Sequence, residues 1–194
     1  MKPLCISILI SVLFLASHSS AQTFQAGLRL NSEQMNTGPE KFIRSSPLFS
    51  SFYVTGTAFM DNDIAFEARL GYNWEDHYNG IEAGIFSKYY YKDLYAIGGV
   101  AYHHVNDKDY SDGIYRNYFT QKADLFMPAL GVGFNPGRHF ALELMLQHGL
   151  NQKIGYRLNQ AIVFDDHYNP VSEVFPDVNL KWILKFGMSY CFSF

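Results

Sequence analysis

The C-terminal stretch, residues 180–194, reads LKWILKFGMSYCFSF and alternates between large apolar residues and other residue types. One set of alternate positions holds Leu180, Trp182, Leu184, Phe186, Met188, Tyr190, Phe192 and Phe194. The positions between them hold Lys181, Ile183, Lys185, Gly187, Ser189, Cys191 and Ser193. Because successive side chains of a β-strand point to opposite faces, this period of two predicts a strand with one apolar face.

The same alternation recurs along the rest of the chain. FQAGLRLN, IAFEARLGYNW, IEAGIFSKYYY and FALELMLQHGL each place apolar residues on one face and polar or small residues on the other. Two stretches, 51–60 and 94–104, are less regular. Pro128 predicts a bulge or a local irregularity, because proline cannot donate to a central strand ladder. The predicted strands are about 23–31, 50–60, 63–74, 80–91, 94–105, 122–134, 139–150 and 180–194.

The connections between these strands alternate in length. Short turns are predicted at Asp61-Asn62, Lys92-Asp93 and Asn135–Arg138, where the residue types favour tight turns. The longer connections are about 32–49, 75–79, 106–121 and 151–179. Strands of about 9–11 residues can cross a bilayer at a tilt, and an even strand number with short turns at one end is typical of outer-membrane barrels. The fold predicted is therefore all-β, an eight-stranded antiparallel up-and-down transmembrane β-barrel.

The N-terminal segment MKPLCISILISVLFLASHSSA has the layout of a secretory signal peptide, with Lys2, an apolar run and small residues before Gln22. We expect a signal peptide at 1–21 and an outer-membrane β-barrel domain at 22–194. Loss of Lys2 leaves 15 − 1 = 14 basic against 18 acidic residues, a formal charge of −4. This weak acidity argues against a nucleic-acid partner, and Cys191 alone cannot form an intramolecular disulfide.

The polar strand face carries charges that a closed barrel would enclose. An eight-stranded barrel is just wide enough for side chains to fill it, so we expect a lumen charge network that plugs the interior. A soluble lipocalin-like barrel would instead turn its apolar face inward, and periodicity alone cannot separate the two. The network residues expected are Arg29, Glu67, Arg69, Glu82, Lys88, Glu143, Lys181 and Lys185.

Aromatic residues are expected to form two membrane girdles, because amphipathic rings favour membrane interfaces. Trp74 and Trp182 fall near one end of the predicted strands, and Phe192 and Phe194 fall near the other.

The C-terminal strand resembles that of Gram-negative outer-membrane β-barrels, which end in an aromatic residue preceded by apolar residues at alternate positions. Phe186, Met188, Tyr190, Phe192 and Phe194 fill those positions. Residues 128–151, PALGVGFNPGRHFALELMLQHGLN, are similar to the penultimate hairpin of porin-family outer-membrane β-barrel domain proteins. The resemblance spans nearly all of 22–194. It implies a small OmpA/OmpX-like eight-stranded barrel among outer-membrane lipids, with a C-terminal strand that the barrel assembly machinery reads.

This fold hosts adhesins, anchors, channels and lipid-modifying enzymes, so the fold alone does not select a function. We expect a non-enzymatic structural or surface-interaction protein without cofactor or metal, with an extracellular partner at loop 151–179. One alternative is a lipid A deacylase-like enzyme that uses His148. Small barrels of that kind carry an outward-facing Ser-His-Glu set, with the histidine and the serine two residues apart on one strand. Here Leu150, and not a serine, follows His148 at that spacing. The other alternative is a narrow channel. His103 and His104 are adjacent on a strand and therefore point to opposite faces, which disfavours a shared metal.

Overall fold

The computed structural model describes the strands of the domain and parts of their connections. The described residues are 23–38, 42–45, 49–60, 63–75, 78–106, 108–111, 116–120, 122–137, 139–159, 163–164, 170–171 and 177–193. The predicted signal peptide, the turn at Asp61-Asn62 and Phe194 lie outside these ranges. Within them, no helix is both long enough and apolar enough to cross a membrane.

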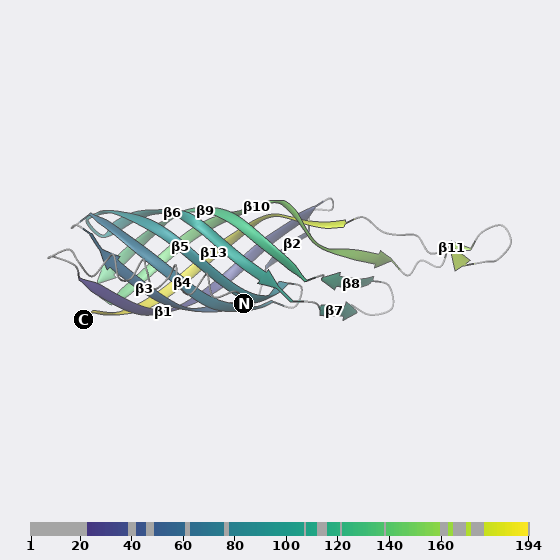
Figure 1. The fold of residues 1–194 in the computed structure, drawn as a ribbon, viewed down its shortest axis with the longest axis horizontal. Coiled ribbons are helices and arrows are strands. Elements are labelled where there is room, and N and C mark those ends of the chain that lie inside the picture. Colours follow the sequence, from purple (N-terminus) through teal and green to yellow (C-terminus); the bar gives the residue numbers. More distant parts are fainter. Residues whose placement is uncertain are drawn as a thin grey trace.

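The barrel is closed by antiparallel pairing of strands that are consecutive around the ring. Each barrel strand pairs with the next, and β13 pairs with both β10 and β1, which completes the ring of eight (Figure 1). The predicted eight-stranded antiparallel up-and-down barrel is therefore confirmed. Its strands are β1 (Phe24–Gly38), β3 (Ser51–Phe59), β4 (Ile64–Glu75), β5 (Tyr78–Tyr91), β6 (Leu94–Val105), β9 (Ala123–Gly137), β10 (Phe140–Asn159) and β13 (Asp177–Ser193).

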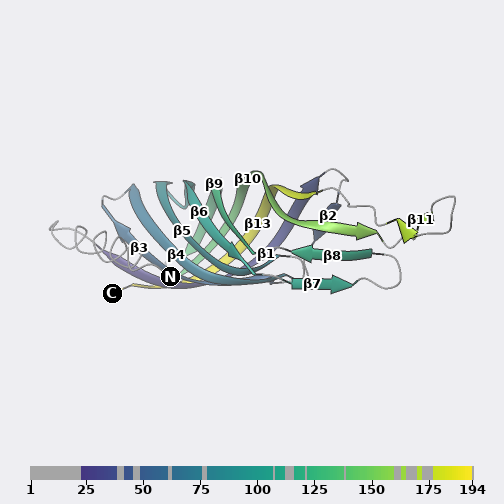
Figure 2. The same ribbon diagram turned by 45° about the vertical axis from the view of Figure 1, so that its right-hand side comes forward.

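The two ends of the barrel differ. The end that carries the turn at Lys92-Asp93, hereafter the short-turn end, also holds the last residues of β13 (Figure 1). The opposite end, hereafter the long-connection end, carries further strands that project away from the barrel (Figure 2). Of these, β2 pairs with β1, β8 pairs with β7 and β10, and β11 pairs with β12. Their bounds are β2 (Phe42–Ser45), β7 (Lys108–Ser111), β8 (Arg116–Thr120), β11 (Val163–Phe164) and β12 (Pro170–Val171).

Several barrel strands extend beyond their predicted ends on this side. β1 continues to Gly38 and β10 continues to Asn159, so the connections predicted to begin at residues 32 and 151 begin later. In these extensions the outward residues include Ser32, Gln34 and Asn36, which are polar. The apolar alternation that marks the rest of each strand is therefore lost there.

Charged residues face the inside of the barrel and large apolar residues face outward. In β9, Leu125, Met127 and Ala129 are buried, whereas the residues between and beyond them, such as Phe126 and Leu130, are exposed. Leu130 is 72% exposed and Leu70 on β4 is 56% exposed, while Arg29 is 1% exposed. This arrangement is the reverse of the soluble lipocalin-like alternative, in which the apolar face turns inward.

Glycines on the inward face make room for large rings on neighbouring strands. A Cβ atom at Gly133 on β9 would overlap the phenol of Tyr95 on β6, and one at Gly71 on β4 would overlap the ring of Tyr53 on β3. In the narrow lumen, a large ring on one strand therefore occupies the space beside a glycine on the next strand.

Pro128 lies outward on β9 and its two sides differ. On the β6 side the register runs without a shift through Val100 and Pro128. On the β10 side the pairing ends at Ala129, one residue before the proline. The local irregularity predicted at Pro128 is therefore found on the β10 side, where the ladder stops, whereas the ladder with β6 shows no bulge there.

Lys181 does not face the lumen, and its predicted place in the charge network is wrong. Trp182 pairs with Asn36 on β1 and with His148 on β10, whereas Leu180 pairs with Thr37 and Gln152, so Lys181 is left out of both ladders. This β-bulge breaks the period of two. Lys181 is therefore exposed on the outside, and Leu180, predicted to face outward, is fully buried in the lumen.

Candidate functional site

The lumen gathers charged side chains from five different strands. Among the described residues, its buried charges are four basic side chains, Arg29, Arg69, Lys88 and Lys185, and four acidic side chains, Glu33, Glu67, Glu82 and Glu143. The enclosed charge therefore sums to zero when every group is ionised. Apart from Lys181, every residue predicted for the network lies inside the barrel.

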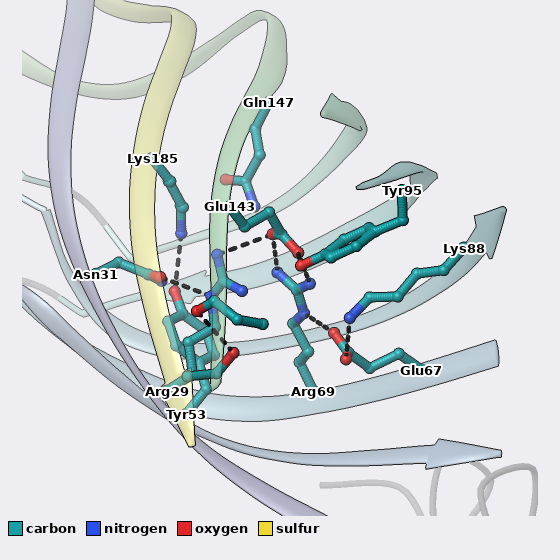
Figure 3. Close-up of polar contacts among 12 residues, drawn as sticks. Arg29, Asn31, Tyr53, Glu67, Arg69, Lys88, Tyr95, Glu143, Gln147 and Lys185 are labelled. Carbon is teal, nitrogen blue, oxygen red and sulfur yellow. Dashed lines mark hydrogen bonds and ion pairs between the residues drawn. The ribbon is translucent and has the colours of Figure 1, made fainter. Parts of the chain in front are cut away.

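One group, the Glu143 cluster, joins Arg29, Glu67, Arg69, Lys88 and Tyr95 around Glu143 (Figure 3). Arg69 donates from Nη1 and Nη2 to the two Glu143 oxygens, at 2.9 and 2.8 Å, and Arg29 Nη2 forms an ion pair with Glu143 Oε1 at 2.8 Å. Bidentate guanidinium–carboxylate contacts of this kind are among the stronger charge-assisted hydrogen bonds.

The same cluster continues through Arg69 to a second carboxylate. Arg69 Nε donates to Glu67, and Lys88 Nζ donates to the other Glu67 oxygen at 2.6 Å. Thr57 donates to Glu67 at 3.0 Å, and Tyr95 donates to Glu143 at 3.0 Å. Buried charges are costly unless they are paired and hydrogen-bonded, and both carboxylates meet that requirement.

A second group, the Lys185 cluster, lies around the ammonium of Lys185 and includes Glu33, Tyr53, Glu82 and Gln147. Lys185 Nζ lies 2.5 Å from Glu82 Oε2 and 3.1 Å from Glu33 Oε1, and it donates to Tyr53 at 2.8 Å. Gln147 donates to Glu82 at 2.9 Å. Asn31 connects the two clusters, because it accepts from Arg29 Nε at 2.7 Å and donates to Ser51, which donates to Glu33.

On the long-connection side of these clusters the lumen is filled by apolar side chains. This apolar layer consists of residues from β1, β6, β9, β10 and β13, each buried to at least nine-tenths: Met35, Val105, Leu125, Met127, Ile154, Leu180 and Ile183. Because protein interiors are close-packed, we expect this apolar layer to close the lumen at that end.

At the short-turn end the lumen opens into a cavity of about 300 Å³. Its lining includes Glu67 and Lys88 of the Glu143 cluster, together with Tyr90, Asn135 and Cys191. The lumen therefore has three parts in series: an open cavity, a charged middle and an apolar layer.

Periodicity missed several members of the network. Glu33 lay in a segment predicted as a connection, although its alternation with the inward residues Arg29 and Asn31 could have placed it inside. Tyr53, Tyr95 and Gln147 are neutral, and a pattern based on charge does not single them out. Their hydroxyl and amide groups nevertheless bind the carboxylates of both clusters.

The aromatic residues predicted for the girdles lie on the outer surface where the structure describes them. Trp74 is exposed near the end of β4, Trp182 is half-buried near the start of β13, and Phe192 is exposed near the end of β13. Phe192 meets Tyr190 edge to face, with ring centroids 5.0 Å apart.

His103 and His104 point to opposite faces, as adjacent strand residues do. His103 is fully buried in the lumen with its Nδ1 3.8 Å from Glu82, whereas His104 lies outside and its Nδ1 is 2.6 Å from Asp124 Oδ1. Tyr102 donates to the same Asp124 oxygen at 2.7 Å. Across the described residues, no group of three or more His, Cys, Asp or Glu side chains could hold a metal ion.

His148 lies on the outer surface of β10 and not in a catalytic arrangement with a serine at residue 150. Leu150 occupies that position, and its backbone N–H donates to His148 Nδ1 at 3.1 Å. The Nδ1 atom, which an acidic partner would orient in a Ser-His-Glu set, is thus used by the strand's own backbone.

Comparison with known proteins finds similarity only among solved structures. No protein-family model matches the chain. No curated protein matches it either. The N-terminal β-barrel domain of OprF from Pseudomonas aeruginosa is 11% identical, with a TM-score of 0.46, and the match covers 87% of this chain and 97% of that one.

Two further solved structures show the same degree of similarity. Neisserial surface protein A (NspA) is 12% identical over 88% of this chain and 99% of that one, with a TM-score of 0.42. OprG from Pseudomonas aeruginosa is 12% identical over 90% of this chain and 97% of that one, with a TM-score of 0.45. The eight-stranded architecture of this chain rests on its own strand pairing.

Proposed function

We propose that this protein is an integral outer-membrane β-barrel with a non-enzymatic, structural or surface-interaction role. The observation that carries the proposal is the inverted distribution of side chains, with charges enclosed and large apolar residues exposed around the barrel. Soluble monomers rarely expose contiguous apolar patches larger than a few hundred Å². Lipid is the solvent that such a surface fits.

The filled lumen supports a structural role over a channel. The apolar layer closes one end, and the carboxylates of the charged middle are held by arginine, lysine and hydroxyl donors. An ion entering this path would have to break paired, buried charges, which is costly. The narrow-channel alternative is therefore the weaker one.

The surroundings of His148 support a non-enzymatic role. An acyl-transfer enzyme needs a nucleophile within hydrogen-bond reach of its base, and the base must be oriented by a third group. His148 instead accepts from the backbone of Leu150, whose side chain offers no nucleophile.

Surface interaction is proposed for the long-connection end. There β10 pairs with β8 and β13 beyond the apolar band, and β7 and β8 form a hairpin that projects from the barrel (Figure 2). Binding sites are often carried on such extensions of a rigid scaffold. The segment 151–179, which begins within β10, remains the proposed place for an extracellular partner, and β13 is the proposed signal for the barrel assembly machinery.

The test uses purified protein refolded in detergent, compared on a gel with and without boiling and then added to a planar bilayer. A closed membrane barrel should migrate differently when boiled and should give no steady conductance. Unchanged migration would contradict the membrane barrel. Steady conductance from the heat-modifiable protein would contradict the closed lumen and favour a channel.

A further inference from the structure

Two neighbouring strands, β10 and β13, lose their regular pairing at one level of the barrel. Lys181 is left out of both ladders of β13, and residues 149–151 of β10 have no partner on β13. The same bulge shifts the β1–β13 register between Asn36 and Thr37, after that register has run unbroken from Gln25. A coincidence of irregularities in adjacent strands marks a local construction and not a frayed end.

Specific hydrogen bonds hold the irregular segment of β10. Leu150 and Asn151 have φ values of 50° and 57°, a left-handed conformation that is uncommon for residues other than glycine. The Gln152 side chain bonds to both backbone groups of Phe126, with Nε2 donating to its oxygen at 2.9 Å. Gln152 Nε2 also donates to Gly149 O at 3.0 Å. Strained backbone that is fixed in this way is characteristic of functional sites.

The irregularity leaves two nitrogen groups exposed at the same level of two neighbouring strands on the outer surface. It turns Lys181 outward, next to Trp182, which pairs directly with His148. Because His148 Nδ1 accepts from Leu150 N–H, the neutral ring carries its proton on Nε2. No described residue forms an ion pair or hydrogen bond with Lys181 Nζ or with His148 Nε2. Both groups can therefore donate to a ligand.

The position of this pair identifies the ligand chemistry. Below it on β10, Leu144 and Leu146 are exposed members of the apolar band, and Leu150 is 54% exposed beside it. Above it the strands become polar, and Asp177 is already paired with Lys153 at 2.6 Å. A cation and an N–H donor at this boundary lie where lipid headgroups meet acyl chains, with Trp182 as an interfacial anchor.

We infer that Lys181 and His148 form a binding site for a phosphate group of an outer-leaflet lipid, with Leu150 against its acyl chains. A phosphate offers several acceptor oxygens and negative charge, which an ammonium and an imidazole N–H complement. The inference rests on the proposed membrane location, and it goes beyond it by assigning a specific lipid contact.

The experiment titrates detergent-solubilised protein with phosphorylated lipid A and with the same lipid after removal of its phosphates. The chain has two tryptophans, so Trp74→Phe leaves Trp182 as the fluorescent reporter beside the site. We expect the phosphorylated lipid to bind about tenfold more tightly, the effect of one good charge-assisted contact. Lys181→Gln should remove that preference and His148→Gln should reduce it. Lys122→Gln, an equal charge loss at the same end of the barrel, should leave it unchanged.

Three results would overturn the inference. The two lipids could bind equally, Lys122→Gln could have the same effect as Lys181→Gln, or millimolar inorganic phosphate could displace the lipid, which would indicate a free-anion site. Each variant is first checked for heat-modifiable migration. A folded barrel without lipid preference defeats only this inference, whereas a protein that is not heat-modifiable defeats the proposed function itself.

Discussion

At the scale of single residues, Lys181 and Lys185 show what position on a strand does to the same side chain. They lie on one strand of one barrel, yet Lys181 is exposed outside and Lys185 is buried between Glu33 and Glu82. Removing one partner of a buried ion pair leaves an uncompensated charge, whereas an exposed lysine has water as its alternative partner.

Lys185→Gln should therefore lower the free energy of unfolding by about 3 kcal/mol or more, because two carboxylates lose their shared cation. Lys181→Gln, the matched control, should change it by no more than about 0.5 kcal/mol. Urea unfolding in a detergent without phosphate groups, where Lys181 has no lipid phosphate to bind, measures both. Equal effects of the two substitutions would contradict the bulge that separates them.

The sequence predicted most of the lumen charges but not their full set of partners. Alternation placed Arg29, Glu67, Arg69, Glu82, Lys88, Glu143 and Lys185 on the inward face, because period two holds wherever a strand is regular. It misplaced Lys181, because a bulge shifts the period by one residue and nothing in the local residue types marks it. Pairing between strands depends on register, which a single sequence does not contain.

At the scale of elements, β10 combines a lower half that pairs regularly with β13 and an irregular level at residues 149–151. The neighbouring strand β9 contains Pro128, whose missing N–H cannot complete a ladder, and the β9–β10 pairing stops beside it. The Gln152 side chain takes the place of a strand partner there, because it accepts from the Phe126 N–H and donates to the Phe126 carbonyl oxygen.

Gln152→Ala should remove the acceptor of the Phe126 backbone N–H. A backbone group left unsatisfied in this position costs about 1–3 kcal/mol. We expect hydrogen exchange at the Phe126 N–H to become about tenfold faster or more. Gln147→Ala is the matched control, since that glutamine lies on the same strand but binds Glu82 in the lumen. Unchanged exchange at Phe126 in the Gln152 variant would show that β9 is held there by other contacts.

The predicted elements were most accurate where lipid is the proposed solvent. β4 and β6 differ from prediction by a residue or less at each end, since an apolar outward face gives the alternation its contrast. β1 and β10 extend well past their predicted ends, where outward residues such as Gln34 are polar. In water neither face needs to be apolar, so a strand there leaves no period-two signal to read.

At the scale of the whole molecule, the barrel is a closed unit whose projecting strands are attached to different degrees. β8 is paired to β10, so it continues the wall of the barrel. Among the described strands, β11 and β12 pair with each other and form a separate two-stranded sheet. β10 and β13, which close the ring, remain paired as far as Tyr156 and Asp177. We therefore expect the segment beyond that pair to be dispensable for closure.

Deletion of residues 160–175 should therefore leave a folded, heat-modifiable barrel. The deletion joins Asn159 to Pro176, so residues 157–159 and 176 connect the Tyr156–Asp177 pair, and hairpin connections of about four residues are common. Gel mobility with and without boiling measures the outcome, with the full-length protein as reference. Loss of heat-modifiable migration would show that this segment helps to close the barrel. If the shortened barrel keeps its fold, the deleted segment is not needed to close the strand ladder. Its sequence would then be free to serve the proposed partner site.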